Sequence, residues 1–408
     1  MAKRLHCRTA RQPHRDLTGR KSPQRKAVAT LDFQTTRRII AETGAVRRIG
    51  ALARELGIAH ALVVTDAGIH ASGLTEDLAE SLAAADIRVS LYTDVVPDPP
   101  EAVVLEAVAR ARDVNIDGVI GFGGGSSMDV AKVIAVLANS KQKIAEIYGI
   151  GNVRSPRLPL IQVPTTAGTG SEVTPIAIIT TGETTKTGIV SPQLLPDIAL
   201  LDAALTRALP PHVTAATGID AMVHAIEAFT SKIKKNPYSD LLAMQALRLL
   251  SANITRAVTQ GNDLTARENM LYGAMLAGQA FANAPVAAVH ALAYPLGGHY
   301  HISHGLSNSL MLPHVIAFNL PAAEKLYEEL CPALFPFESE KSSADVFLRK
   351  MNALIDATSL PKTLSAMKIP QNDLPMLARD AMLQQRLLVN NPRPVTENDA
   401  LQLYQAAW

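Results

Sequence analysis

Two patterns of apolar residues alternate along the first half of the chain. Between about residues 35 and 200, short continuous apolar runs typical of buried strands alternate with stretches in which apolar residues recur at helical spacing. The pattern predicts strands at residues 60–65, 87–92, 118–122 and 160–164, and helices at residues 45–56, 76–85, 100–113 and 126–139. Because strands and helices alternate, we expect a parallel sheet with helices on both faces.

After about residue 205 the pattern becomes almost entirely helical. Stretches rich in Ala, Leu and Met at residues 218–230, 238–260, 265–283 and 288–294 contain few strand candidates. Pro210 and Pro211 interrupt the pattern between the two halves. We therefore expect an α/β domain at residues 29–204 and an all-α domain at residues 205–408, a division that suits a chain too long for one hydrophobic core.

The composition is typical of a compact globular protein, with 48% hydrophobic and 19% charged residues in a chain of 408. Charge is distributed unevenly, because residues 1–28 hold nine Lys or Arg residues against one acidic residue, Asp16. The rest of the chain is mildly acidic. We interpret residues 1–28 as a disordered extension, with a targeting segment or an anion-binding arm as the alternative.

Several classes of protein are excluded on these grounds. A mildly acidic body with 4% aromatic residues does not suit a nucleic-acid surface, which needs a basic groove with aromatic platforms. No uncharged stretch reaches the roughly 18 residues of a membrane span, and no apolar signal segment follows the basic leader. Cys7 and Cys331 form no disulfide framework. We expect a cytoplasmic protein with no nucleic-acid or membrane partner.

Three consecutive glycines, Gly123, Gly124 and Gly125, lie between a predicted strand and a predicted helix. Without Cβ atoms the backbone can approach a ligand closely, and the helix N-terminus presents unpaired N–H groups that suit a pyrophosphate. In the alternative interpretation Ser126 only caps the helix, with Asp129 completing a capping box. Three glycines exceed what a cap requires, so phosphate binding is favoured.

Further polar residues surround this loop in the predicted sheet. Asp66 ends a strand 57 residues before Gly123, where its carboxylate would bind an adenosine ribose and repel a 2′-phosphate, which favours NAD over NADP. A plain strand-end aspartate is an equal alternative for Asp66. Thr165, Thr166 and Thr169 lie in a loop that either wraps a polar ligand or forms an ordinary turn. Lys186 is either a cation against the cofactor or a surface residue.

The helical half contains a candidate metal site. Asp220 and His224 are four residues apart, which places both on one face of a helix, and residues 289–305 supply several imidazoles. One carboxylate with two or three imidazoles forms a site for Fe²⁺ or Zn²⁺, whereas burial of these groups without a partner is costly. Glu227 is interpreted as a helix-surface charge, with a hydrogen-bond acceptor behind a ligand as the alternative. Surface positions are expected for His299, His301 and His314.

Taken together, these motifs resemble the iron-containing, group III alcohol dehydrogenases over about residues 30–400. The resemblance implies a dehydroquinate synthase-like fold, in which a Rossmann-like dinucleotide-binding domain and a helical metal-binding, catalytic domain enclose a cleft. It also selects His290 and His304 among the neighbouring histidines. The metal ligands that it implies are Asp220, His224, His290 and His304, and the NAD-binding residues are Asp66, Asp98, Gly123, Gly124, Gly125, Ser126, Asp129, Thr165, Thr166, Thr169 and Lys186.

Two residues depart from the family pattern. Asp98 stands where many members carry Asn. Tyr294 stands where many members carry a histidine thought to help relay the proton, and a phenol has an ordinary pKa near 10 against about 6.5 for imidazole. Tyr294 is therefore a catalytic candidate that relays a proton, binds the substrate or only packs beside the metal. Tyrosine occurs there in some relatives that handle hydroxy acids, so a 4-hydroxybutyrate-type substrate stays open.

Our hypothesis is a metal-dependent, NAD-linked alcohol dehydrogenase. It transfers a hydride reversibly between NAD(H) and a small primary alcohol, aldehyde or hydroxy acid, with Fe²⁺ or Zn²⁺ as Lewis acid on the substrate oxygen. The alternatives are a hydroxyacid-oxoacid transhydrogenase, a dehydroquinate synthase-like lyase without net NADH production, and a nucleic-acid-binding protein led by its basic segment. We expect a homo-oligomer, namely a dimer.

Overall fold

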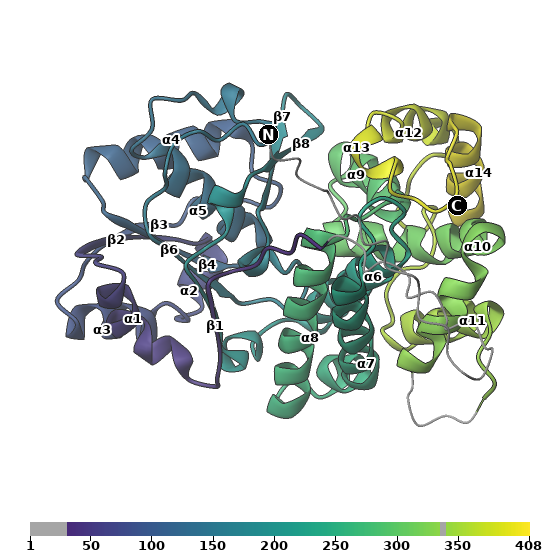
Figure 1. The fold of residues 1–408 in the computed structure, drawn as a ribbon, viewed down its shortest axis with the longest axis horizontal. Helices are drawn as coiled ribbons and strands as arrows, with labels where there is room; N and C mark the ends of the chain where they lie inside the picture. Colours follow the sequence, from purple (N-terminus) through teal and green to yellow (C-terminus); the bar gives the residue numbers. More distant parts are fainter. Residues whose placement is uncertain (1–30, 335–339) are drawn as a thin grey trace, which may run out of the picture. The chain divides into compact units, whose positions relative to one another are not determined.

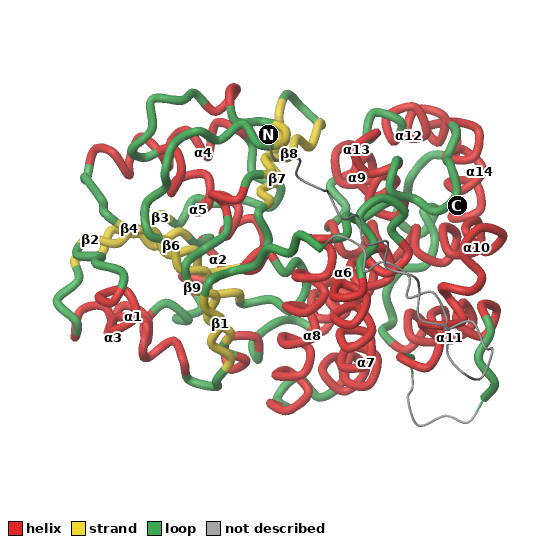
Figure 2. Tube along the Cα trace, in the orientation of Figure 1, coloured by secondary structure: helices red, strands yellow, loops and turns green. Residues whose placement is uncertain are grey.

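The strands of the first half form a parallel sheet, which has six strands in the part of the chain that the structure describes (Figure 2). The computed structural model describes residues 31–334 and 340–408, so the predicted basic extension at residues 1–28 lies outside the described residues. The strand order is β1-β9-β6-β4-β2-β3, and every neighbouring pair is parallel. The strands are β1 (Arg38–Ala41), β2 (His60–Val64), β3 (Arg88–Tyr92), β4 (Gly118–Gly123), β6 (Leu160–Pro164) and β9 (Ile198–Leu201).

Helices cover both faces of this sheet, as the sequence predicted. Figure 1 shows α4 and α5 on one side of the sheet and α1 and α3 on the other. Leu62 and Val64 of β2 pack in the apolar cluster under α4 and α5, whereas Ala61 and Val63 pack in the cluster under α1 and α3. Successive side chains of a strand point to opposite faces, so a strand buried on both faces is a continuous apolar run. The helices are α1 (Ile49–Glu55), α2 (Ala67–Ala71), α3 (Glu76–Ala84), α4 (Glu101–Asp113) and α5 (Gly125–Leu137).

A second, smaller sheet was not predicted. It contains β5 (Gly149–Ile150), β7 (Ile176–Thr181) and β8 (Thr185–Val190), with β7 and β8 paired as an antiparallel hairpin. Thr180 of β7 pairs with Lys186 of β8 and also forms a bridge to Pro100. The hairpin therefore brings Lys186 close to the segment that contains Asp98.

Helices make up the second half, which confirms the predicted order of an α/β part followed by an all-α part. The helix α6 is central, because it is buried over most of its length and packs against α7, α8 and α10 (Figure 1). No helix in residues 31–334 and 340–408 is both long and apolar enough to cross a bilayer. The helices are α6 (Pro211–Thr230), α7 (Pro237–Thr259), α8 (Leu264–Asn283), α9 (Ala288–Tyr300), α10 (His304–Leu330), α11 (Ala344–Ala357), α12 (Leu374–Ala381), α13 (Gln385–Leu388) and α14 (Glu397–Ala407).

A glycine pair joins the sheet half to the helical half. Gly170, with a φ of 59°, lies in the loop after β6 and contacts Gly278 of α8. A Cβ atom on Gly278 would lie 2.8 Å from the Cα atom of Gly170, which is closer than real Cβ atoms approach. Glycine at both positions thus allows the backbone of α8 to approach the loop that follows the sheet.

Candidate metal and cofactor site

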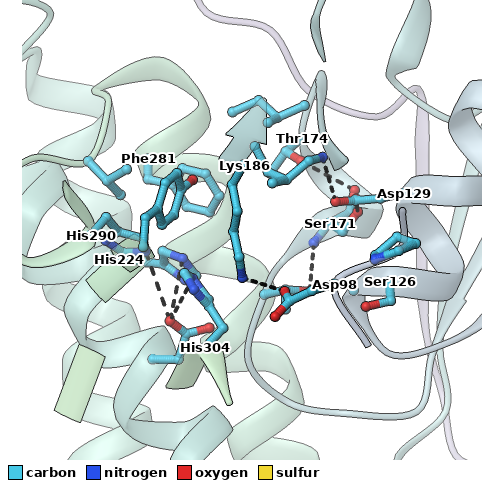
Figure 3. Close-up of a pocket in the computed structure, with 18 of the residues that line it drawn as sticks. Asp98, Ser126, Asp129, Ser171, Thr174, Lys186, His224, Phe281, His290 and His304 are labelled. Atoms are coloured by element: carbon cyan, nitrogen blue, oxygen red, sulfur yellow. Dashed lines mark hydrogen bonds and ion pairs between the residues drawn. The ribbon is translucent and has the colours of Figure 1, made fainter. Parts of the chain in front are cut away.

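The four predicted metal ligands meet at one point, although they come from three helices. Asp220 and His224 lie one turn apart on α6, His290 lies on α9 and His304 begins α10. Figure 3 shows His224, His290 and His304 gathered at one place. Asp220 Oδ1 lies 3.6 Å from His304 Nε2 and 3.9 Å from the Nε2 atoms of His224 and His290. One ligand atom from each residue lies within 4.8 Å of all the others. We call Asp220, His224, His290 and His304 the ligand cluster.

The charges in the ligand cluster suit a cation. Burial lowers the pKa of His224 to about 3 and that of His304 to about 4, so both imidazoles are neutral near pH 7 and keep a free lone pair. Burial raises the pKa of Asp220, but the neighbouring histidines and a hydrogen bond hold it below its ordinary value. The result is one anionic oxygen among imidazole nitrogens in a buried site, which is a donor set for Fe²⁺ or Zn²⁺.

Glu227 is not a surface charge, so the preferred interpretation of the sequence is wrong. Glu227 is 3% exposed, and its Oε2 atom lies 2.7 Å from His290 Nδ1. The carboxylate also accepts hydrogen bonds from the backbone N–H groups of Ala287 and Val289. Glu227 therefore holds the His290 ring with its Nε2 atom turned toward the ligand cluster, as carboxylates behind metal-binding histidines do.

Asn308 lies against the ligand cluster, and the sequence analysis did not select it. Its Nδ2 atom donates to Asp220 Oδ1 at 2.6 Å and lies 3.2 Å from His304 Nε2. Its Oδ1 atom is buried and has no hydrogen-bond partner among residues 31–334 and 340–408. The four-residue spacing from His304 on α10 is the signal that would have placed this amide beside the ligand cluster.

The remaining predicted surface histidines stay outside the ligand cluster. His299 is half-buried and pairs with Asp380 of α12 at 2.6 Å. His301 is exposed with a φ of 53°, and His314 is half-buried on α10. The spacing between histidines alone did not separate these three from His290 and His304.

The glycine loop, residues 123–126, leads from β4 into α5 without a side-chain cap. Gly124 is the N-cap residue and makes no side-chain cap, and among residues 31–334 and 340–408 Ser126 does not take its place. The alternative in which Ser126 caps the helix is therefore not observed. Asp129 instead accepts hydrogen bonds from Ser171 Oγ and from the backbone N–H of Ile178. The helix N-terminus thus keeps N–H groups available for an anion.

The other predicted cofactor residues lie around the glycine loop. Asp66 Oδ2 would lie 3.7 Å from a Cβ atom on Gly123, and Asp66 Oδ1 accepts a hydrogen bond from Ile69 N at the start of α2. Thr166 and Thr169 face the positions where Cβ atoms on Gly124 and Gly125 would lie. The Thr165 hydroxyl is fully buried and has no hydrogen-bond partner in the described part of the chain. These placements suit a nucleotide but leave the roles of the side chains as predictions.

Lys186 and Asp98 form an ion pair between the hairpin and the ligand cluster. Lys186 Nζ donates to Asp98 Oδ1 at 2.5 Å, and Figure 3 shows the lysine reaching from the hairpin toward this carboxylate. The Lys186 side chain is 4% exposed, so it is not a surface lysine. The charge that Asp98 adds at this position is thus neutralised by Lys186.

A cavity of about 870 Å³, open to solvent, connects the ligand cluster with the predicted cofactor residues at the glycine loop. Tyr294 lines this cavity, and its ring centroid lies 5.9 Å from that of His304. Burial raises the pKa of Tyr294, so its hydroxyl stays protonated near pH 7. The cavity wall also contains the whole ligand cluster together with Asp98, Gly125, Ser126, Asp129, Thr169, Lys186, Phe281 and Val286.

Comparison with known proteins gives matches over nearly the whole described chain. The family model "Iron-containing alcohol dehydrogenase" matches residues 36–203, and "Fe-containing alcohol dehydrogenase family, C-terminal" matches residues 214–408. Long-chain-alcohol dehydrogenase 1 of Geobacillus thermodenitrificans is 42% identical over 371 residues, which cover 90% of this chain and 93% of the relative.

Two further matches have the same extent. The NAD-dependent methanol dehydrogenase of Bacillus methanolicus is 35% identical, over 89% of this chain and 96% of the relative. A solved structure of a 1,3-propanediol oxidoreductase superposes with a TM-score of 0.89 at 34% identity, over 93% of this chain and 100% of that chain. These matches confirm the resemblance inferred from the sequence, and they span relatives named for different alcohols.

Proposed function

Because the chain belongs to the iron-containing alcohol dehydrogenase family and is an oxidoreductase of that type, we propose that it transfers a hydride reversibly between NAD(H) and a small primary alcohol or its aldehyde. In this proposal the ligand cluster holds Fe²⁺, with Zn²⁺ as the alternative metal, and the glycine loop holds the pyrophosphate of NAD. Asp66 binds the adenosine ribose, which favours NAD over NADP.

One observation carries the proposal: the ligand cluster and the start of α5 line the same cavity. A nucleotide whose pyrophosphate lies on the glycine loop can therefore extend its nicotinamide end toward the ligand cluster. Hydride transfer requires this proximity, because the donor and acceptor carbons must be in contact at the moment of transfer.

The side chains of the cavity have separate tasks in this reaction. When bound, the metal supplies Lewis acidity at the substrate oxygen, and NAD supplies the hydride acceptor. Glu227 keeps the proton on His290 Nδ1, and Phe281 stacks on the His224 ring with centroids 4.3 Å apart, which excludes water from that side. Tyr294 keeps its proton, so it donates a hydrogen bond to the substrate rather than acting as a base.

The test is the formation of NADH by the metal-stripped full chain, reloaded with Fe²⁺ or Zn²⁺ and supplied with alcohols and diols plus NAD or NADP. We expect NADH formation that depends on added metal, with NAD preferred. NADH formation that is independent of metal would contradict the proposal. A lyase would form its product without net NADH, and a transhydrogenase would exchange hydride between a hydroxy acid and an oxo acid without using free NAD.

His224→Ala tests the ligand cluster directly. The variant lacks one of the four donor atoms, so we expect metal content and NADH formation to fall together, by about 100-fold or more in turnover. His301→Asn is the matched control, because His301 is exposed and lies outside the ligand cluster. Full metal content and full turnover in His224→Ala would show that the metal site is elsewhere.

A further inference from the structure

The charged residues of the cavity pair with one another, with one exception. Asp98 pairs with Lys186 at 2.5 Å, and Asp129 lies 3.8 Å from the fully buried Lys132. Asp220 belongs to the ligand cluster. Arg386 also lines the cavity, but no carboxylate lies within ion-pair distance of its guanidinium in residues 31–334 and 340–408.

The position of Arg386 is fixed by its surroundings. It lies on α13, which packs against α9, and its backbone carbonyl accepts a hydrogen bond from Asn390 Nδ2. The same amide donates to the backbone carbonyl of Val286, which belongs to the cavity wall. A Cβ atom on Gly188 of β8 would lie 3.3 Å from Arg386 Nη2, so the absence of a side chain there leaves room for the guanidinium.

Arg386, Tyr294 and the ligand cluster line the same cavity. The ring of Tyr294 lies beside that of His304, with centroids 5.9 Å apart, and the Arg386 guanidinium lies near enough to its hydroxyl to act on its pKa. Burial raises the pKa of Tyr294, and the positive charge of Arg386 opposes this effect. Because the guanidinium and the ligand cluster line the same cavity as Tyr294, a substrate bound in this cavity can face both groups.

We propose that Arg386 binds the anionic end of a short hydroxy acid, or of the corresponding oxo acid, while the hydroxyl or carbonyl end lies at the ligand cluster. A guanidinium forms two parallel hydrogen bonds with a carboxylate or sulfonate, and the Tyr294 hydroxyl supplies a further donor. In oxidation, the hydride leaves the hydroxyl-bearing carbon for NAD⁺ and the hydroxyl proton leaves to solvent, giving the oxo acid and NADH.

This inference rests on the proposed function and names its substrate class. Arg386 has the role of a specificity determinant, because it contacts the end of the substrate that does not react. Its loss therefore acts mainly on KM for anionic substrates and leaves neutral alcohols of equal length little changed. A guanidinium that served NAD instead would affect every substrate equally.

The experiment compares 4-hydroxybutyrate, 3-hydroxypropane-1-sulfonate and butane-1,4-diol with the metal-loaded full chain and NAD. We expect the wild-type enzyme to prefer at least one of the two acids over the diol, and the two acids distinguish a carboxylate from a sulfonate end. In Arg386→Gln, kcat/KM for the preferred acid should fall by about 10- to 100-fold, with a change of less than about 3-fold for the diol.

Two variants complete the comparison. Arg386→Lys keeps the charge and should restore part of the activity on the acid, which a purely structural role would not predict. Arg379→Gln removes an exposed arginine of α12 and should change neither substrate. Equal loss on acid and diol in Arg386→Gln, or a wild-type preference for the diol, would overturn the inference.

Failure of the proposed function can be recognised separately. If the wild-type enzyme oxidises neither the acids nor any alcohol or diol of the panel used to test the proposed function, that function is wrong, and the anion site is then tested by calorimetry with butyrate on the same metal-loaded chains. Binding that is about tenfold weaker in Arg386→Gln than in the wild type supports the site. Equal affinity for butyrate in the two proteins overturns it.

Discussion

At the scale of single residues, the ligand cluster depends on a carboxylate that is not part of it. Glu227 is fixed by the backbone N–H groups of Ala287 and Val289, and it holds His290 at 2.7 Å. This arrangement sets which ring nitrogen of His290 carries the proton. A neutral amide in place of Glu227 would still fill the space but would lose the charge that makes the imidazole a stronger donor.

Glu227→Gln should therefore weaken metal binding by about 10- to 100-fold while the chain stays folded. The measurement is the dissociation constant for Zn²⁺ or Fe²⁺ in competition with a chelator, with circular dichroism as the check on folding. Glu268→Gln is the control, since Glu268 is exposed on α8, where it accepts a hydrogen bond from Thr43, and does not belong to the ligand cluster. An unchanged affinity in Glu227→Gln would mean that the His290 ring needs no carboxylate behind it.

The example of Glu227 shows that the sequence does not determine whether a single charged residue is buried or exposed. Its three-residue spacing from His224 indicates a shared helix face but does not tell whether that face is covered. The burial of Glu227 depends on the segment before α9, which is 60 residues away in the chain. No pattern in the sequence around Arg386 indicated that it lines the cavity, because only the packing of α13 on α9 brings it there.

At the scale of elements, α5 is the helix that begins at the proposed pyrophosphate site. It starts at Gly125 directly after β4, and its first turn has no side-chain cap. A phosphate at this position satisfies the N–H groups that the protein itself leaves unpaired. The glycine loop then lets a phosphate reach the backbone.

Gly124→Ala should weaken NAD binding without changing the stability of the fold. The nearest protein atoms to a Cβ on Gly124 are those of Thr166 at 3.7 Å, which is ordinary van der Waals contact, so the thermal stability without NAD should be unchanged. We expect the dissociation constant for NAD to rise by about tenfold, because the methyl group keeps the pyrophosphate from the backbone. Calorimetric titration with NAD checks this, and metal affinity should remain at the wild-type value.

The strands that the sequence did not predict were missed for two reasons, incomplete burial and short length. The strands β2, β4 and β6 are buried on both faces and therefore appear as continuous apolar runs. The hairpin β7–β8 is buried less completely, and β8 contains the polar run Thr185, Lys186 and Thr187. The strands β1 and β9 have only four residues each, so no periodicity could be recognised in them, although β9 is fully buried.

At the scale of the whole molecule, the site exists only where the sheet half and the helical half meet. The glycine loop and Lys186 come from the first half, whereas the ligand cluster and Arg386 come from the second. The proposed division between residues 204 and 205 falls between β9 and α6. The contact of Gly170 with Gly278 is one of the points that set the distance between the halves.

Gly278→Val should disturb this contact. The new side chain would meet the backbone of Gly170 and the side chain of Val173 at 2.8 Å, and backbone atoms cannot move aside cheaply. We expect the free energy of unfolding to fall by about 1–3 kcal/mol, measured by denaturant titration. Thr265→Ala, at an exposed position of the same helix, should have little effect. A stability equal to that of the wild type would show that the halves can separate slightly without cost.

The sequence by itself determined the elements that local patterns of residues specify. Apolar periodicity predicted the central strands and the helical half, and the spacing of Asp220 and His224 predicted a shared helix face, because both depend on residues a few positions apart. Only the tertiary structure decided that Glu227 is buried and that Asn308 and Arg386 reach the site. These positions depend on packing between segments far apart in the chain, which no local pattern specifies.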